Sequence, residues 1–324
     1  MSAVFVTGAS GFIGGAITRD LARDHTVWAL SRREASDAGI RALGAEPVRG
    51  SLEDLAPGDL PDCDAVVHCA AHVAPWGTRE EVFRINVGGT ERVLAAARGA
   101  GARRFVQMST EAVLWRGQHL RDVDETCPYP ARTPFLYSES KAQAERRVLA
   151  ANAPGFATLA LRPRFVWGPG DTTLVPELRA MAERGAFAWI GGGQATTSTT
   201  HIANLVHGTR LALEKGRGGE AYFLTDGEPI RFRELLPRLA EANGFTLAGP
   251  SIPAPLARGA AFALETLWRA VGARSAPPLT RHAVALMCCD CTLDDRKAQR
   301  ELGYAPVITL SEGLAALGSE AASG

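Results

Sequence analysis

Tyr137 and Lys141 are the two side chains of this sequence whose types and spacing best suit the transfer of a proton. They are four residues apart, so both would lie on one face of a helix. A phenol titrates at about 10 in water, and an adjacent cation favours its charged form. We therefore expect the pair to donate or accept a proton near neutral pH. Ser109 and Thr110, which follow an apolar segment, are expected where a reacting group would be held.

A glycine-rich stretch near the N-terminus has the composition of a dinucleotide-binding loop. Residues 3–7 form a short apolar run typical of a buried strand, and residues 12–21 carry helical periodicity. In a strand–turn–helix unit, glycines let backbone N–H groups approach a pyrophosphate, whose charge the helix dipole also favours. We predict that a dinucleotide contacts Gly8, Ser10, Gly11, Phe12, Ile13 and Gly14.

The end of the second predicted strand, residues 26–30, should distinguish NADP from NAD. An acidic side chain at this junction would accept hydrogen bonds from a ribose 2′-hydroxyl, as in NAD sites. The chain has Ser31, Arg32 and Arg33 there, and guanidinium groups suit a 2′-phosphate. The junction carries no carboxylate that would repel that phosphate. We therefore favour NADP(H), with NAD as the alternative cofactor.

The remaining segments predict the α/β fold that would bring these residues together. Strand-like segments at residues 46–49, 64–68 and 104–108 alternate with helical segments up to about residue 160. This alternation is typical of a doubly wound parallel sheet. We predict a Rossmann-type domain over residues 1–166, with returns near 200–226, and a smaller, mostly helical C-terminal substrate cap over 167–324.

Composition and charge exclude several classes of partner. The 324 residues carry 35 basic and 35 acidic side chains, so bulk charge favours neither nucleic acid nor an anionic membrane. No apolar run approaches the ~20 residues that span a bilayer, and the first strand leaves no room for a secretory signal.

We expect a cytoplasmic protein whose six cysteines are thiols. We assign no metal to Cys288, Cys289 and Cys291, which lack zinc-site spacing, or to His68 and His72.

Recognisable motifs extend along the whole chain. They are TGASGFIG at 7–14, NVGGT at 86–90, MST at 108–110, YSESK at 137–141, LRPRFVWGPGD at 161–171, LVPEL at 174–178, THIANLVHG at 200–208 and LGYAP at 302–306. As a set they resemble the extended short-chain dehydrogenase/reductases, the NAD-dependent epimerase/dehydratase superfamily. The likeness is strongest to the branch of 3β-hydroxysteroid and sterol dehydrogenases. It implies an NAD(P)-dependent enzyme that acts on a CH–OH group.

The resemblance also implies roles for residues at matching positions. Tyr137 would be the general acid/base, and Lys141 would hold the nicotinamide ribose and lower the pKa of the tyrosine. Thr110 would bind the substrate oxygen, and Ser51 replaces the aspartate that usually contacts adenine. The expected cofactor contacts also include Ser31, Arg32, Arg33, Ser51, Leu52, Ala70, Ala71, Asn86, Ser109, Tyr137, Lys141 and the backbone of Pro163.

Residues 255–272 predict a helix that is apolar over most of its circumference. Arg258, Glu265 and Arg269 fall within about 40° of one another and form one narrow polar stripe. Such a helix must bury most of the surface around its circumference. It could pack within its own domain, in a homodimer, over a hydrophobic substrate or shallowly in a membrane surface. Trp76 follows the strand at 64–68 and could either contact substrate or cap the core.

Together these observations predict an NADP(H)-dependent oxidoreductase that interconverts a secondary alcohol and a ketone on a hydrophobic, sterol-like or alkyl substrate. Hydride would pass between the substrate carbon and the nicotinamide, while Tyr137 and Thr110 hydrogen-bond the carbonyl oxygen. A sugar-nucleotide epimerase or dehydratase with tightly bound NAD shares the fold, as does a reductase of flavonoid-like or β-keto-acid substrates. A non-catalytic NAD(P)-sensing protein is a rival of another class, although such proteins tend to lose the tyrosine or lysine.

Overall fold

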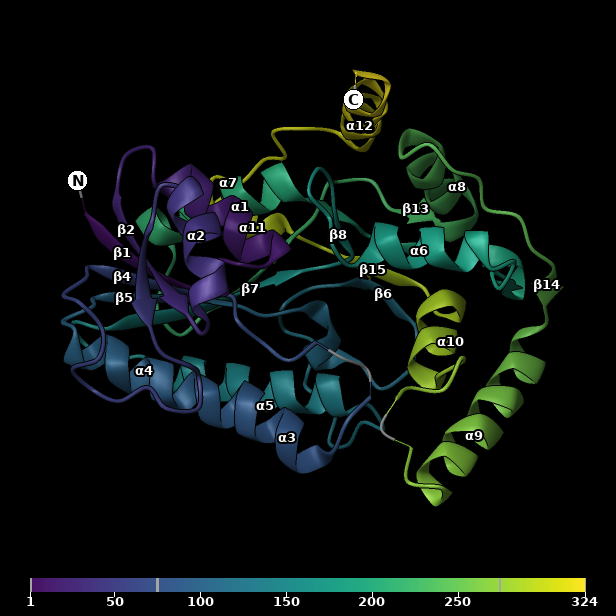
Figure 1. Cartoon of the computed structure of the whole chain (residues 1–324), viewed down its shortest axis with the longest axis horizontal. Coiled ribbons are helices and arrows are strands. Elements are labelled where there is room, and N and C mark those ends of the chain that lie inside the picture. The colour runs from purple at the N-terminus through teal and green to yellow at the C-terminus, as the bar shows by residue number, and fades with distance from the viewer. Residues whose placement is uncertain (1, 74–75, 274, 324) are drawn as a thin grey trace.

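Seven parallel strands form the central sheet of the computed structural model, which describes residues 2–73, 76–273 and 275–323. Their spatial order is β12-β7-β5-β4-β1-β2-β3 (Figure 1). The order reverses at β1, and ligands bind such sheets at this switch point, beyond the carboxyl ends of the strands. The strands are β1 (Ala3–Thr7), β2 (Thr26–Ser31), β3 (Glu46–Arg49), β4 (Ala65–His68), β5 (Arg104–Met108), β7 (Ala157–Pro163) and β12 (Ala221–Leu224).

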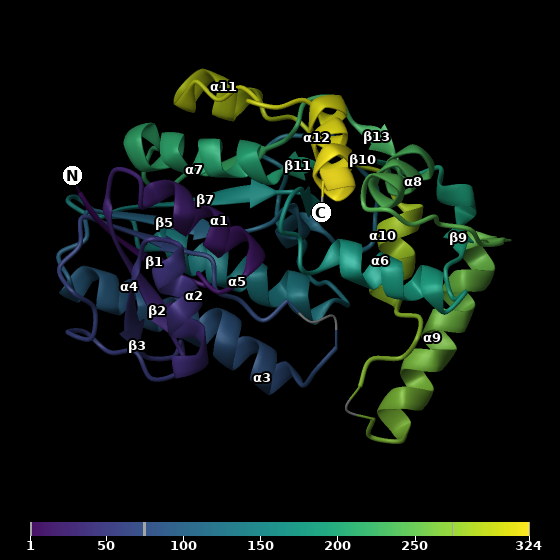
Figure 2. The same cartoon turned by 45° about the horizontal axis from the view of Figure 1, so that its top comes forward.

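Helices cover both faces of this sheet, which is why its middle strands are apolar on both sides. Phe5, Val66 and Phe105 are fully buried within it. Figures 1 and 2 show α3 (Arg79–Phe83), α4 (Gly89–Gly99) and α5 (Leu136–Ala150) on one face. The other face carries α1 (Phe12–Leu21), α2 (Asp37–Ala42), α7 (Ile202–Lys215) and α11 (Arg296–Leu302). This doubly wound, Rossmann-type arrangement confirms the predicted fold class.

The helical segment that follows β4 is interrupted in the structure. Between α3 and α4 the chain takes one π-helical turn at Arg84–Gly88. Asn86 lies in this turn, and its side chain bonds both backbone groups of His72 instead of pointing to solvent. Such π turns inside helices are often found at functional sites.

The C-terminal half forms a smaller, mostly helical cap beside the carboxyl ends of the strands. Its helices α6, α8, α9 and α10 lie at one end of the sheet in Figure 1. In contrast, α7, β12 and α11 return to the main sheet. The cap helices are α6 (Leu174–Glu183), α8 (Phe232–Ala242), α9 (Ala254–Ala270), α10 (Arg281–Cys288) and α12 (Leu310–Ser323).

Short strands connect the cap to the main domain. A four-stranded sheet has the order β13-β10-β15-β6, and two strand pairs join β11 to β8 and β14 to β9. Their bounds are β6 (Leu120–Val123), β8 (Val166–Trp167), β9 (Trp189–Ile190), β10 (Thr196–Thr197), β11 (Thr200–His201), β13 (Ile230–Arg231), β14 (Ser251–Ile252) and β15 (Cys291–Leu293).

Helix α9 projects away from the main sheet in both ribbon views (Figures 1 and 2). Its inner side packs on α10 through Ala257 and Ala261, which are buried with Val284 and Ile190 in one small core. Glu265, from the predicted polar stripe, is also buried on this side and binds Arg281 of α10. Packing within its own domain therefore buries only part of the apolar circumference, because Glu265 faces α10 while Leu256, Phe262, Leu267 and Val271 stay exposed.

Two further properties concern membranes and thiols. Among the helices in the described ranges, none combines the length and apolar content that would let it cross a bilayer. All six cysteines are free, including Cys288, Cys289 and Cys291. Burial raises the pKa of the Cys291 thiol to about 12, so it stays protonated and packs as a small apolar side chain.

Candidate functional site

A cavity of about 730 Å³ lies at the carboxyl ends of β1, β2, β4 and β5. It begins at the glycine-rich turn between β1 and α1. Gly8 has φ +78°, and a Cβ there would lie 2.8 Å from the backbone nitrogen of Ala70. A Cβ on Gly14 would lie 2.2 Å from the carbonyl oxygen of Gly8. The turn therefore requires glycine at both positions, and it brings the N-terminus of α1 against the cavity.

Most of the residues predicted to contact a dinucleotide line this one cavity. The exceptions are Ser31, Asn86 and Lys141. The predicted residues that the structure brings together are Gly8, Ser10, Gly11, Phe12, Ile13, Gly14, Arg32, Arg33, Ser51, Leu52, Ala70, Ala71, Ser109, Thr110, Tyr137 and Pro163.

Ser31 does not line the cavity, contrary to the sequence-based expectation. It is buried, and its hydroxyl donates to the carboxylate of Asp37 at 2.5 Å and accepts from Arg49 at 3.2 Å. The sequence reasoning also missed Asp37, a carboxylate close to this junction. Arg49 pairs with Asp37 at 2.6 Å, which offsets its charge. Arg32 and Arg33 remain exposed on the cavity wall as the available cations.

Asn86 is likewise a positioning residue in the structure and lies outside the cavity lining. Its side-chain oxygen accepts from the backbone N–H of His72 at 2.7 Å, and its amide donates to the carbonyl of His72 at 3.0 Å. The same amide donates to the Ser140 hydroxyl at 3.0 Å. Asn86 thus ties the loop after β4, which lines the cavity, to helix α5.

The chemically reactive side chains meet at one end of the cavity, where β5 and α5 come together. Tyr137 lies in the first turn of α5, and Thr110 follows β5 by two residues. Burial raises the pKa of Tyr137, the charge of Glu111 raises it further, and a hydrogen bond with Thr110 lowers it. A phenol in this position keeps its proton well above neutral pH.

Lys141 lies one turn after Tyr137 in α5. Its ammonium donates to the carbonyl oxygen of Met108 at 2.7 Å. Burial lowers the pKa of Lys141 to about 8, although the charge of Glu145 opposes this. The lysine therefore lies beside the cavity, joined to the end of β5.

Glu111 is a cavity residue that the sequence reasoning missed. Its carboxylate accepts a hydrogen bond from the hydroxyl of Thr110 at 2.7 Å. Its other oxygen accepts from the guanidinium of Arg164, which is itself buried and donates to Thr197 at 3.1 Å. A glutamate directly after the Ser-Thr pair was visible in the sequence. However, its partner is 53 residues away, so spacing could not indicate the ion pair.

Arg164 leads into a strained turn on the same wall. Phe165 lines the cavity with φ +46°, a left-handed conformation that is rare for a residue with a side chain. Its ring packs edge-to-face on Phe232, with centroids 5.4 Å apart. Such strain is found at functional sites, where the surrounding packing maintains it.

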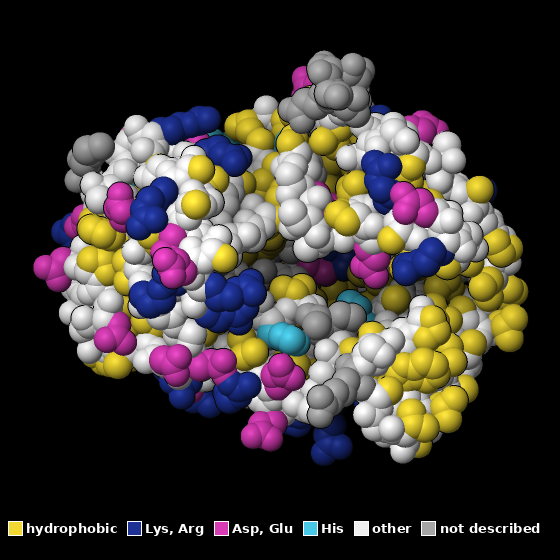
Figure 3. Space-filling model, in the orientation of Figure 1, with side chains coloured by type: hydrophobic (Ala, Val, Ile, Leu, Met, Phe, Trp, Pro, Cys, Tyr) yellow, Lys and Arg dark blue, Asp and Glu magenta, His cyan; other side chains and the backbone are white. Residues whose placement is uncertain are grey.

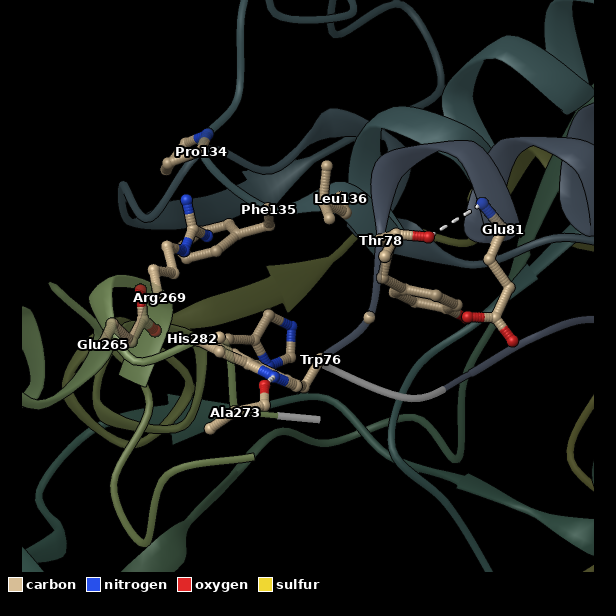
Figure 4. A pocket seen from close by; sticks show the side chains of 13 residues that line it. Trp76, Thr78, Glu81, Pro134, Phe135, Leu136, Glu265, Arg269, Ala273 and His282 are labelled. Atoms are coloured by element: carbon tan, nitrogen blue, oxygen red, sulfur yellow. Dashed lines mark hydrogen bonds between the residues drawn. The ribbon is translucent and has the colours of Figure 1, made fainter. Parts of the chain in front are cut away.

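A second cavity of about 540 Å³ lies on the cap side of Tyr137, which lines both cavities. Figure 4 shows Trp76, Phe135, Arg269 and His282 directed toward this space from four different segments. The indole N–H of Trp76 donates to the carbonyl of Ala273 at 3.2 Å, which links the loop after β4 to the end of α9.

Both aromatic and charged side chains line this second cavity. His282 packs edge-to-face on Phe135, with ring centroids 5.2 Å apart, and burial lowers its pKa. Arg269 stacks over Trp76 at 5.6 Å. The carboxylate of Glu265 is neutralised by Arg281 at 2.7 Å. Figure 3 shows the hollow between the two halves of the molecule where the cavities open.

His68 is a structural residue, as the sequence reasoning favoured. Its ring nitrogens bond the hydroxyls of Thr7 at 2.7 Å and Thr90 at 3.0 Å, and burial lowers its pKa to about 3. It therefore joins β1, β4 and α4 as a neutral imidazole. Within the described ranges, no group of three or more metal-ligating side chains is positioned to hold an ion.

Comparisons with known proteins agree with this geometry. A model of the 3-beta hydroxysteroid dehydrogenase/isomerase family matches residues 5–254. A ketoreductase of Stigmatella aurantiaca, named for 4-hydroxy-2-methyl-3-oxo-4-farnesyl-3,4-dihydroquinoline-1-oxide, is 46% identical over 97% of this chain and 95% of its own. A 2-alkyl-3-oxoalkanoate reductase of Stenotrophomonas maltophilia is 36% identical over 99% of both chains. The solved structure of MoeE5 in complex with UDP-glucose and NAD has a TM-score of 0.75, with 26% identity over 98% of this chain and 97% of its own.

Proposed function

The chain belongs to the 3-beta hydroxysteroid dehydrogenase/isomerase family and is an NAD(P)-dependent oxidoreductase of hydroxyl and keto groups, and we propose that it reduces a ketone on a hydrophobic substrate with NADPH. The reverse reaction, oxidation of a secondary alcohol, uses the same residues. The observation that carries the proposal is the position of Tyr137, whose phenol lines both the cavity of the glycine-rich turn and the cavity of the cap.

The first cavity fits a dinucleotide. Its glycine-rich turn has no room for a Cβ at Gly8 or Gly14, and helix α1 begins against it. A pyrophosphate would lie at this N-terminus. Arg32 and Arg33 would hold the 2′-phosphate of NADP, since Asp37 is already neutralised by Arg49. A nicotinamide cofactor bound here supplies or accepts the hydride.

The second cavity supports a hydrophobic substrate. Trp76, Phe135 and Leu136 give it apolar walls, and Tyr137 provides the polar group at its inner end. A keto group directed toward Tyr137 would leave an alkyl or polycyclic body against the aromatic side chains. The two curated relatives are named for 3-oxo compounds with an alkyl or farnesyl group, which agrees with this orientation.

In the proposed reduction, Tyr137 donates its proton to the carbonyl oxygen as negative charge develops there. Burial and the charge of Glu111 both raise the pKa of this phenol, which keeps the proton available. Thr110 orients the phenol, and turning its own hydroxyl toward the substrate requires leaving the carboxylate of Glu111. Lys141 would hold the nicotinamide ribose from the adjacent turn of α5.

Fluorescence titration of the purified protein with NADPH and, separately, NADH tests the cofactor. We expect NADPH to bind at least about tenfold more tightly, because Arg32 and Arg33 can pair with its additional phosphate. Turnover is then measured with a 2-alkyl-3-oxoalkanoate and a 3-ketosteroid. Preference for NADH would contradict the assignment of the arginines, and failure to bind either nucleotide would contradict the proposed site.

The alternative of a sugar-nucleotide epimerase or dehydratase rests on the structural likeness to MoeE5. It is the weaker proposal, because the described lining of the cap cavity is largely apolar and aromatic and offers one arginine, Arg269, where a nucleotide diphosphate would need several cations. Release of tightly bound NAD from denatured protein, together with turnover of a UDP-sugar, would favour it over the reductase.

A further inference from the structure

The cap cavity contains a cation that no carboxylate of the described chain neutralises. Arg269, near the end of α9, lines this cavity, and its guanidinium carbon lies 5.6 Å from the centroid of the Trp76 ring. Within residues 2–73, 76–273 and 275–323, this guanidinium forms no ion pair and no hydrogen bond. Stacking on an aromatic ring uses the face of a guanidinium. The N–H groups at its edge therefore stay available for a ligand.

The carboxylate that would be the usual partner of this arginine is already occupied. Glu265 lies one turn before Arg269 on α9, at the spacing where opposite charges on a helix pair. However, both of its oxygens bind Arg281 of α10. One accepts from the backbone N–H at 2.7 Å, and the other accepts from the guanidinium Nε at 2.7 Å. The positive charge of Arg269 is thus left for a group that enters the cavity.

The free negative charge of the cavity lies on its opposite side. Glu81 of α3 lines the cavity and is exposed, and Figure 4 shows it across the space from Arg269. Phe135 and Leu136 lie between these two charges in that view. An anionic group is therefore attracted toward α9 and repelled from α3. The arrangement suits a ligand that has an apolar body and one anionic group.

A second hydrogen-bond donor lines the same cavity. His282 of α10 packs edge-to-face on Phe135, and none of the described residues hydrogen-bonds its ring nitrogens. Burial lowers the pKa of His282, so the ring is neutral near pH 7 and carries one N–H. The imidazole adds a donor without a second positive charge. The cavity is therefore better matched to the single charge of a carboxylate than to a phosphate or diphosphate.

We propose that the substrate carries a carboxylate in addition to its keto group, and that Arg269 binds this carboxylate in the cap cavity. The inference rests on the proposed function, because it assigns a substrate class to the cavity in which Tyr137 supplies the proton. The edge of a guanidinium donates two N–H groups to the two oxygens of a carboxylate. Trp76 holds the plane of the guanidinium. Arg269 is thus a specificity-determining residue that contacts the substrate away from the reacting carbonyl.

Reduction of a matched acid and ester tests the proposal. The probes are 3-oxododecanoate and its methyl ester, which share the keto group and the alkyl chain but differ by one negative charge. Arg269 is exposed, so solvent weakens the ion pair, and we expect kcat/KM to be about fivefold to tenfold higher for the acid. The preference should decrease as salt rises. Equal kcat/KM for the two probes would overturn the proposal and leave the ketone reductase intact.

Variants of the arginine locate the contact. Arg269→Gln removes the charge and should lower kcat/KM for the acid to the value for the ester. Arg269→Lys keeps the charge without the planar edge and should recover part of the preference. Arg258→Gln is the matched control, because Arg258 is exposed on the same helix and lines neither cavity. Equal loss for acid and ester in Arg269→Gln would overturn the proposal, since it would show a structural role.

A binding measurement separates this proposal from the proposed function. Calorimetric titration of the full-length protein with decanoate and with decan-1-ol, with and without NADPH, requires no turnover. We expect decanoate to bind at least about fivefold more tightly, and Arg269→Gln to remove that difference. If this result holds but neither oxo probe is reduced, the ligand class stands and the reductase assignment fails. Equal binding of the two probes to the wild type would overturn the proposal whatever the turnover.

Discussion

Replacing Glu111 by glutamine would test whether this buried carboxylate controls the proton of Tyr137. In the structure Glu111 accepts a hydrogen bond from the Thr110 hydroxyl at 2.7 Å, and Thr110 is hydrogen-bonded to Tyr137. The negative charge of Glu111 opposes ionisation of the phenol and so raises its pKa. The amide of glutamine has nearly the same shape without the charge. We therefore expect the pKa of Tyr137 to fall in the variant.

The size of this change follows from the geometry. Two hydrogen bonds in series place the carboxylate and the phenol oxygen about 5 Å apart. At an effective dielectric constant of about 20, two unit charges at that distance interact by about 3 kcal/mol, or roughly two pKa units. Arg164 lies on the other side of Glu111 and offsets part of that charge. A decrease of about one to two units is therefore expected.

The assay is the pH dependence of kcat for ketone reduction with NADPH. Reduction needs the protonated phenol, so the rate falls as pH rises through the pKa of Tyr137. The decline should begin about one to two pH units lower in Glu111→Gln than in the wild type. Glu241→Gln, which removes an exposed carboxylate on α8, should leave the profile unchanged. An unshifted profile in Glu111→Gln would refute the reasoning.

Stability must be measured on the same variant. Glu111→Gln leaves the guanidinium of Arg164 buried without its counter-charge, and breaking a buried pair costs about 3–5 kcal/mol. Removing both charges, in Glu111→Gln with Arg164→Gln, should recover part of that loss in urea unfolding. If the double variant is folded and still has a lower pH limit than the wild type, although by a smaller amount because the offsetting charge of Arg164 is also gone, the shift comes from the lost charge of Glu111 and not from unfolding.

Three other substitutions test the proposed site. Tyr137→Phe should lower kcat at least ~100-fold with cofactor affinity nearly retained, as measured by fluorescence titration. Arg32→Ala with Arg33→Ala should weaken NADPH binding about tenfold and spare NADH; equal losses would contradict the phosphate assignment. Gly14→Ala should abolish dinucleotide binding and cost about 2 kcal/mol or more in urea unfolding, since its Cβ would lie 2.2 Å from the Gly8 oxygen. Gly39→Ala, which meets nothing within 4 Å, is its control and should change stability by less than about 1 kcal/mol.

Local patterns in the sequence predicted the elements that hold the site. The bounds of β1, α1, β3 and β5 agree with the prediction. The three strands are each followed by a turn residue, which is Gly8, Gly50 or Ser109. The cavity lining also follows from sequence order, since the carboxyl ends of parallel strands meet at one edge of a sheet. These features depend on neighbours in the chain, which a single sequence contains.

The errors involve partners that are distant in sequence. Ser31 was expected to contact a cofactor because of its position at the end of β2, but Arg49 lies 18 residues further on and forms a hydrogen bond with its side chain. Glu111 was passed over because Arg164 is 53 residues away. The inward direction of Glu265 on α9 likewise depends on Arg281 of another helix. Periodicity reports which face of a helix is polar, but it does not report which face a neighbouring helix will cover.

Tyr137 forms the common wall of two cavities built from different parts of the chain. One cavity consists of strand ends and the glycine-rich turn, whereas the other includes Trp76, Arg269 and His282 from a loop and two cap helices. We expect substitutions at those three positions to alter what the enzyme accepts without disturbing the residues around the glycine-rich turn. In evolution, such a division lets a lineage acquire new substrates by drift in the cap while purifying selection maintains the sheet. Reconstructed ancestors of this family would then differ from one another mainly in α9 and α10.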